Sequence, residues 1–383
     1  MKKSIFFCTK CLNSNLRPRL TFDRNGICDA CQYSDKKYNS INWETRNRML
    51  RDLCRKYRSK DGSHDVIVPT SGGKDSCFVA YKLKYEYGMN PLCVSWAPAI
   101  TTEIGWKNMK LFSEFFDTII YTPNRKLHAK LTRIAFEKFG DPFQPWHYGQ
   151  QSYPLKVAMR YKIPFVMYGE NQDAIYGGGK KKQEDADESI KKRYENQKFR
   201  VKKGVDTLVE LGIKQKIFDK SSKKKTNLFD DYRLPNPKDI YNFKIKMYHF
   251  SFFEKWITQD NYYYAKEKMG FGVGLARSQG TYTSYTSLDD KVDELYYYMQ
   301  YIKFGFGRCT SEASIDVRDN IITREEGVRL VRLYDGEFPS EDLNEVLEYM
   351  GITKKKFFQI VDKFRSKKLW NKKKNKWYLK YKL

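Results

Sequence analysis

Short apolar runs alternate with longer segments of helical apolar spacing through the first half of the chain. The short runs predict buried strands, and the longer segments predict amphipathic helices. Strands are expected at Val66–Thr70, Pro91–Trp96, Thr118–Tyr121 and Pro164–Tyr168. Helices are expected at Ile41–Tyr57, Asp75–Tyr87, Glu103–Phe115, Lys126–Phe139 and Pro154–Tyr161. This alternation predicts an α/β fold built on a doubly wound parallel sheet.

The pattern changes from Tyr241 onward. A further strand is expected at Tyr248–Phe253, followed by helices at Thr258–Lys268 and Leu288–Lys303. A capping box at Thr323–Glu326 opens another helix, so the C-terminal region is expected to be mainly helical. The predicted segments are a four-cysteine module at 1–40, an α/β domain at 41–180, a basic insertion at 181–240, and a C-terminal region at 241–383 that completes the active site.

A glycine turn joins the first expected strand to the next helix. Its residues are Ser71, Gly72, Gly73, Lys74, Asp75 and Ser76. The two glycines let backbone N–H groups approach an anion, and the N-terminus of the following helix adds a positive end. Ser71, Lys74 and Ser76 supply further donors, and Asp75 is suited to hold magnesium. The spacing is not that of a Walker A motif, so a phosphate-binding loop of another kind is predicted.

A second polar turn, Gly169-Glu170-Asn171, leaves the fourth expected strand. Because ligands in such sheets bind beyond the carboxyl ends of the strands, Glu170 is expected near the phosphate loop. A loop with polar caps explains the same residues equally well. Three cations adjoin glycine-rich turns and are suited to neutralise a departing pyrophosphate, although ordinary surface cations would look the same. They are Arg277, Lys303 and Arg308.

Two Cys-x2-Cys pairs, Cys8/Cys11 and Cys28/Cys31, supply four thiolates at a spacing that suits tetrahedral zinc. An iron–sulfur cluster or a redox pair is the alternative. The N-terminus lacks the apolar core of a signal peptide, and no apolar stretch reaches the ~20 residues of a membrane span. A soluble, cytoplasmic protein is therefore expected, in a compartment that favours metal over disulfides.

The formal net charge is +26, and thirteen Lys or Arg stand against Asp362 alone from Thr353 to the end. A second basic stretch runs from Lys180 to Lys225. Aromatic residues between the tail lysines are compatible with nucleic-acid binding. We favour a different interpretation, in which these aromatics form the buried face of a helix and a short hairpin. Nucleic acid is then not the expected partner. Both interpretations allow the positive charge to attract an acidic substrate.

The loop Ser71–Ser76 resembles the PP-loop of the ATP pyrophosphatase superfamily, whose fold is adenine nucleotide alpha hydrolase-like. In that superfamily the loop holds the β- and γ-phosphates, and AMP is transferred. Together with the four cysteines and the blocks at 168–171, 280–283, 287–291, 301–308 and 322–326, the chain resembles the N-acetyl sugar amidotransferase family of PseA- and WbpG-like proteins. The resemblance covers nearly the whole chain.

This resemblance implies an ATP-dependent enzyme that converts an N-acetyl group of a bacterial surface sugar to an acetamidino group through an adenylated imidate. The substrate would be a pseudaminic acid-type or nucleotide-activated bis-N-acetyl sugar of flagellin glycosylation, O-antigen or lipopolysaccharide biosynthesis. The expected catalytic residues are Lys74, Asp75, Lys303 and Arg308. The expected ATP-binding residues are Ser71, Gly72, Gly73, Lys74, Asp75, Ser76, Gly169, Glu170, Asn171 and Arg277, with Mg²⁺ on Asp75 and Zn²⁺ on the four cysteines.

Ammonia has no evident source within the chain, because none of its cysteines stands in a Gly-x-Cys-x-Gly elbow and residue 2 is Lys2. A separate glutaminase is therefore expected as partner, and the family resemblance implies a cyclase-like subunit beside it. Two alternatives stay open at this point. A tRNA-modifying PP-loop thiolase would explain the zinc pairs and the basic tail, but it usually needs cysteines near the ATP site. A non-catalytic RNA-binding protein would not need the intact Lys74 and Asp75.

Overall fold

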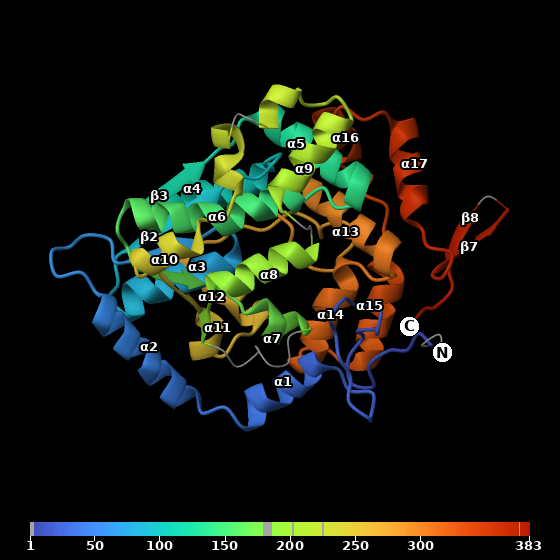
Figure 1. The fold of residues 1–383 in the computed structure, drawn as a ribbon. Coiled ribbons are helices and arrows are strands. Elements are labelled where there is room, and N and C mark those ends of the chain that lie inside the picture. Colours follow the sequence, from blue (N-terminus) through green and yellow to red (C-terminus); the bar gives the residue numbers. More distant parts are fainter. Residues whose placement is uncertain (1–3, 179–185, 201–202, 224–225, 375) are drawn as a thin grey trace.

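The computed structural model describes residues 4–178, 186–200, 203–223, 226–374 and 376–383 (Figure 1). Its main sheet has the strand order β3-β2-β1-β4-β6-β5. The first five strands in this order are parallel, and β5 is antiparallel to β6. The four expected strands are confirmed. The bounds are β1 Val66–Pro69, β2 Pro91–Trp96, β3 Thr118–Tyr121, β4 Phe165–Tyr168, β5 Asp187–Glu188 and β6 Lys246–His249.

Helices cover both faces of this sheet, as the strand residues themselves show. Val66 and Val68 of β1 belong to one core cluster, whereas Ile67 between them belongs to another. Alternate residues of a strand point to opposite faces, so the doubly wound prediction is confirmed. The first face packs on α2 Trp43–Tyr57, α3 Lys74–Tyr81 and α12 Thr258–Met269, and the second on α5 Arg125–Phe139, α6 Gln144–Arg160 and α9 Val205–Lys214. Helix α4 spans Glu103–Phe115, and α3 runs on as a π-helix, η1 Lys82–Glu86.

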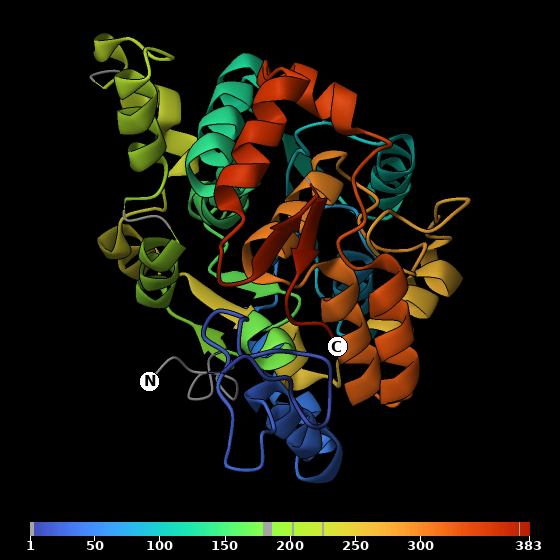
Figure 2. The same ribbon diagram turned by 90° about the vertical axis from the view of Figure 1, so that its right-hand side faces the viewer.

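The C-terminal region is mainly helical, as predicted. Its helices are α13 Val292–Phe304, α14 Arg308–Arg318, α15 Arg324–Tyr334, α16 Leu343–Met350 and α17 Lys354–Phe364, followed by the hairpin of β7 Trp370–Lys373 and β8 Lys376–Leu379. These elements gather on the side of the molecule that faces the viewer in Figure 2. Phe357 and Trp370 are buried in a third core cluster with Met299. The helix and hairpin expected for the basic tail are therefore present, and the capping box of Thr323 and Glu326 is formed.

One expected element is wrong in part. The apolar run from Tyr248 to Phe253 was assigned to a strand, but β6 ends at His249 and a helical turn, α11 Phe250–Phe253, follows. Phe250 packs edge-on against Phe78, which holds the turn over the first face of the sheet. A short apolar run is compatible with strand or helix, so periodicity alone does not separate the two.

The predicted insertion packs on the α/β domain where it is described. Val205 and Leu208 of α9 share a core cluster with Ile134 of α5. Its other helices are α8 Ile190–Arg200, η2 Lys220–Lys223, η3 Thr226–Tyr232 and α10 Pro237–Asn242. The predicted boundary between residues 180 and 181 lies outside the described residues, and the domain limits stay predictions. Within the described part of the chain, no helix is both long and apolar enough to cross a bilayer.

Candidate active site and metal centre

The strand order creates a crevice between β1 and β4. The chain moves outward from β1 through β2 to β3 on one side, and from β4 to β6 on the other. Loops that leave adjacent strands at such a switch point diverge and leave a ligand-sized gap. The loop after β1 is 70–73, and the loop after β4 leads into the short helix α7 Gln172–Tyr176. The two polar turns predicted from sequence therefore border the same crevice.

The phosphate loop is shaped by its own hydroxyl groups. Gly72 N–H donates to Thr70 Oγ1 at 2.9 Å, and the Thr70 hydroxyl donates to Ser76 Oγ at 2.8 Å. Gly72 has φ +76°, and a Cβ there would lie 3.1 Å from the Cα of Met109 on α4. Glycine is required at this position both by the backbone conformation and by the packing. Gly73 then caps the N-terminus of α3, whose first residue is Lys74.

Lys74 and Asp75 are held from the neighbouring helix. Lys74 is buried, and its ammonium group pairs with one carboxylate oxygen of Asp75. The other oxygen accepts a hydrogen bond from Asn261 Nδ2 on α12 at 3.0 Å. Asn261 is 1% exposed, and sequence reasoning missed it. A polar residue beside Tyr262, Ala265 and Met269 on the buried face of α12 was the available signal.

Lys74 and Asp75 line one shared pocket. Lys74, Asp75 and Glu170 come from the α/β domain, and Arg308 comes from the first turn of α14. The pocket therefore has an α/β wall and a C-terminal wall. Its remaining lining residues are Ile175, Tyr176, Trp256, Thr258, Thr283, Tyr285, Thr286, Glu312, Ile315 and Asp316.

The C-terminal wall is built mainly by one face of α14. Arg308, Glu312 and Asp316 follow one another at intervals of four, which places them on the same side of the helix. Arg308 pairs with Glu312 and donates to the hydroxyl of Tyr297. Burial raises the pKa of Asp316 to about 6, although the Tyr282 hydroxyl donates to it and opposes the rise. Glu312 and Asp316 were missed from sequence, and their spacing from Arg308 was the signal.

Glu170 lies on the α/β wall of the pocket. Burial, and next the nearby charge of Asp75, raise its pKa from the usual 4.5 to about 7, whereas Lys74 and Arg308 oppose the rise. A carboxyl group of this pKa exchanges its proton near neutral pH, as general acid–base catalysis requires.

The neighbours of Glu170 have supporting positions. The side chain of Asn171 accepts from the backbone N–H of Asp173 and caps α7. A Cβ on Gly169 would lie 3.1 Å from the ring of Trp256. The absence of a side chain at this position therefore leaves room for the ring. Neither residue is among the described residues that line the pocket. Their predicted contact with ATP stays a prediction.

Two predicted cations are not brought to this pocket by the part of the chain that the structure describes. Lys303 Nζ donates to the carbonyl of Phe139 at 2.6 Å. Arg277 forms a bidentate ion pair with Glu337. The distances are 2.7 Å from Nη1 to Oε2 and 2.9 Å from Nη2 to Oε1. Both are partly buried and engaged by protein groups. Their predicted part in catalysis and ATP binding stays a prediction.

The four predicted metal ligands do come together. The sulfur atoms of Cys8 and Cys31 are 3.8 Å apart, and those of Cys11 and Cys28 are 3.7 Å apart. All four sulfurs lie within 4.8 Å of one another and are buried. A tetrahedral ion with metal–sulfur bonds of about 2.3 Å separates its ligands by about 3.8 Å. The thiolate set therefore fits one tetrahedral metal ion.

Comparison with known proteins bears on the C-terminal wall. A solved structure similar to the chain is the U34-tRNA thiolase NcsA from Methanococcus maripaludis with its 4Fe-4S cluster, at 14% sequence identity over 91% of this chain and 97% of that chain. Its TM-score of 0.33 is too low to support any argument. No curated protein matches. Residues 279–383 match the C-terminal domain of the WbpG-like LPS biosynthesis proteins. This segment contains Thr283, Arg308 and Asp316 of the pocket, so the likeness to WbpG-like proteins covers the C-terminal wall.

Proposed function

We propose that the chain is an ATP-dependent, AMP-forming amidotransferase that converts an N-acetyl group of a bacterial surface sugar to an acetamidino group. One observation carries the proposal. Lys74 and Asp75 of the phosphate loop face the same pocket as Arg308, Glu312 and Asp316 of the WbpG-like segment. The wall that we propose to bind phosphate thus shares the pocket with a segment similar to the C-terminal domain of WbpG-like LPS biosynthesis proteins.

The chemistry needs two steps. The carbonyl oxygen of the acetamido group attacks the α-phosphate of ATP, and pyrophosphate leaves. Ammonia then adds to the adenylated imidate carbon, and AMP departs with the original oxygen. Without this activation, the amide would have to expel a much poorer leaving group.

The residues of the pocket have matching roles in the proposal. Lys74 and the N–H groups at the start of α3 bind the pyrophosphate portion, and Arg308 offsets charge at the reacting phosphate. Asp75 would hold Mg²⁺, which supplies charge neutralisation when bound. Glu170 accepts a proton as ammonia attacks. The four cysteines hold Zn²⁺ as a structural ion.

The C-terminal wall fits a sugar. Thr283 and Thr286 present hydroxyl groups, and Asp316 presents a carboxylate that accepts hydrogen bonds from sugar hydroxyls. The same carboxylate would pair with the acetamidino product, which is a cation at neutral pH. We propose an acidic or nucleotide-activated N-acetyl sugar, of the pseudaminic acid or bis-N-acetyl type, as substrate. A separate glutaminase with a cyclase-like subunit would supply ammonia in the cytoplasm.

The pocket chemistry favours this function over tRNA thiolation. Sulfur transfer usually uses catalytic or cluster-binding cysteines near the ATP site, and none of the described residues that line the pocket is a cysteine. Cys77, the nearest in sequence, is 2% exposed, and burial raises the pKa of its thiol. The direct test is AMP formation from ATP with each substrate class. AMP release that depends on both an N-acetyl sugar and ammonium supports the proposal, and release that depends on tRNA refutes it.

A further inference from the structure

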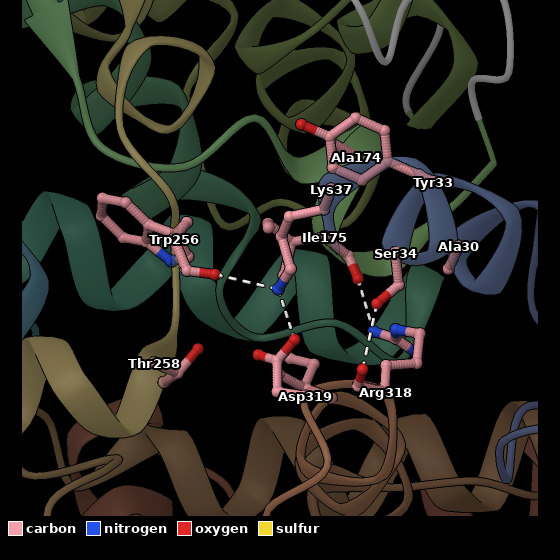
Figure 3. Close-up of a pocket in the computed structure, with 11 residues that line it drawn as sticks. Ala30, Tyr33, Ser34, Lys37, Ala174, Ile175, Trp256, Thr258, Arg318 and Asp319 are labelled. Atoms are coloured by element: carbon pink, nitrogen blue, oxygen red, sulfur yellow. Dashed lines mark hydrogen bonds and ion pairs between the residues drawn. The ribbon is translucent and has the colours of Figure 1, made fainter. Parts of the chain in front are cut away.

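The four-cysteine module contacts the helices that form the candidate pocket. A second, smaller cavity lies behind this pocket, between α7, α14 and the module helix α1 Asp29–Asn39 (Figure 3). Ile175, Trp256, Thr258 and Ile315 line both cavities. The wall between the two spaces is therefore a single layer of residues, and contacts made on its rear side fix its position on the front.

Arg318, the last residue of α14, spans this rear space. Its Nη2 donates to the carbonyl of Ile175 on α7 at 2.6 Å, and its own carbonyl accepts from Ser34 Oγ of α1 at 3.1 Å (Figure 3). Val317, the residue before it, packs against the four buried cysteines. The end of α14 thus lies between the cysteine cluster and the pocket wall.

Lys37 of α1 makes a second connection. Its ammonium group donates to the carbonyl of Trp256 at 3.1 Å and pairs with Asp319, the residue after Arg318. The side chains of Lys37 and Asp319 are 5% and 3% exposed. Separating a pair this deeply buried would leave a charge without its partner. Breaking the contact therefore costs free energy, which keeps the two helices together. Figure 3 shows Lys37 between its two partners.

The ends of α7 are held by the module as well. Arg19 pairs with Asp173 in the first turn at 3.3 Å. Beyond the last turn, Gly178 N–H donates to Asp29 Oδ2 at 3.0 Å. A Cβ on Gly177 would lie 2.6 Å from Asp29 Oδ1, so this contact requires glycine. Since α7 has only five residues, its position depends on these contacts rather than on its own stability.

We propose that Arg318 is a positioning residue that couples metal occupancy of the four cysteines to the shape of the nucleotide pocket. Cys28 caps α1 and Cys31 lies in its first turn, so a metal ion on the four cysteines fixes the start of this helix. Ser34 and Lys37 of α1 in turn hold Arg318 and Asp319. When the ion leaves, α1 loosens, Arg318 releases Ile175, and α7 moves away from the pocket. The inference rests on the proposed nucleotide site at Lys74 and Asp75.

The test compares R318M, R318K and wild type in the full chain, with R24M as the matched control. Arg24 is an exposed residue of the same module. Three quantities are measured: zinc content, affinity for α,β-methylene-ATP by calorimetry, and amide hydrogen exchange of residues 172–178. R318M is expected to keep its zinc, to bind the nucleotide about tenfold more weakly, and to exchange faster at 172–178. R318K restores part of the affinity, and R24M matches wild type.

Unchanged affinity and exchange in R318M overturn the coupling. If wild type binds no nucleotide, the proposed function fails, and exchange at 172–178 still decides the coupling. If R318M does not fold, zinc is removed from wild type with a chelator instead. Faster exchange at 172–178, while α13 stays protected, then supports the coupling, and unchanged exchange overturns it.

Discussion

Asn261 donates a hydrogen bond to Asp75, with 3.0 Å between Nδ2 and Oδ1. The two residues lie on α12 and α3, which pack side by side although 186 positions separate them in the chain. Lys74 binds the other oxygen of the same carboxylate. Each carboxylate oxygen has two lone pairs, so both keep capacity for a metal ion in an orientation that the protein has already set.

Asp75→Ala is expected to abolish AMP formation with little loss of stability, because its side chain is 35% exposed and serves the metal and the nucleotide. Asn261→Ala keeps the carboxylate and removes only its orienting hydrogen bond. A loss of about 1 kcal/mol of transition-state stabilisation, roughly fivefold in kcat/KM, is expected for it. Steady-state AMP assays and thermal melts check both variants. Wild-type turnover in Asp75→Ala would contradict its role.

Arg308→Lys should slow AMP formation roughly a hundredfold, because a lysine keeps the charge but cannot reproduce the forked donor at the reacting phosphate. Lys303→Met is the matched comparison, since both cations were predicted from sequence to be catalytic. Lys303 donates to the Phe139 carbonyl, so its replacement should leave kcat nearly unchanged and cost about 1 kcal/mol of stability. A large drop in kcat for Lys303→Met would support the catalytic role predicted for it from sequence.

Cys28→Ser should release the metal and lower the midpoint of thermal unfolding, because a structural ion contributes its binding free energy to folding. Cys54→Ala is the control, since Cys54 is equally buried but lies outside the cysteine cluster. Metal content by mass spectrometry, together with melting curves, separates the two variants. Full metal content in Cys28→Ser would show that the four cysteines do not act as one ligand set.

Glu170 makes stability depend on pH in a defined direction. Its pKa is about 7 in the folded chain against 4.5 in the unfolded chain, so the folded state holds an extra proton between these values. Stability from this group is present below pH 4.5 and is lost as pH rises to 7. Between pH 5 and pH 8, wild type should lose on the order of 2 kcal/mol relative to Glu170→Gln. Denaturant unfolding measures the difference.

The exposed Glu267 provides the control for this experiment, because its side chain is 71% exposed. Glu267→Gln should follow the wild-type curve at every pH. Parallel pH curves for wild type and Glu170→Gln would mean that the pKa of Glu170 is not raised.

Local signals explain what the sequence could predict. The strands β2 and β3 and the helix α4 have the expected bounds, because apolar spacing and polar caps such as Thr102 lie within each segment. The phosphate loop and the two cysteine pairs are likewise contiguous motifs. The residues of each motif are close together in the chain. Each motif can therefore be recognised before the tertiary fold is known.

The remaining features depend on contacts between distant segments. Asn261 reaches Asp75 only because α12 packs on α3, and Asp316 enters the pocket only because α14 closes it. Lys303 stands beside a glycine-rich turn in sequence, yet its side chain is drawn to the Phe139 carbonyl. Residue type and spacing indicate what such a side chain is able to do, and only the packing decides what it meets.

The most direct test of the central claim is mass spectrometry of the sugar product. The chain is incubated with ATP, Mg²⁺ and ammonium against free and nucleotide-activated bis-N-acetyl sugars, and AMP is followed in parallel. The account predicts one sugar whose mass changes by replacement of oxygen with NH, with one AMP formed for each product molecule. No altered sugar and no AMP across the panel, with ATP converted to AMP only when bulk tRNA is added, would contradict it.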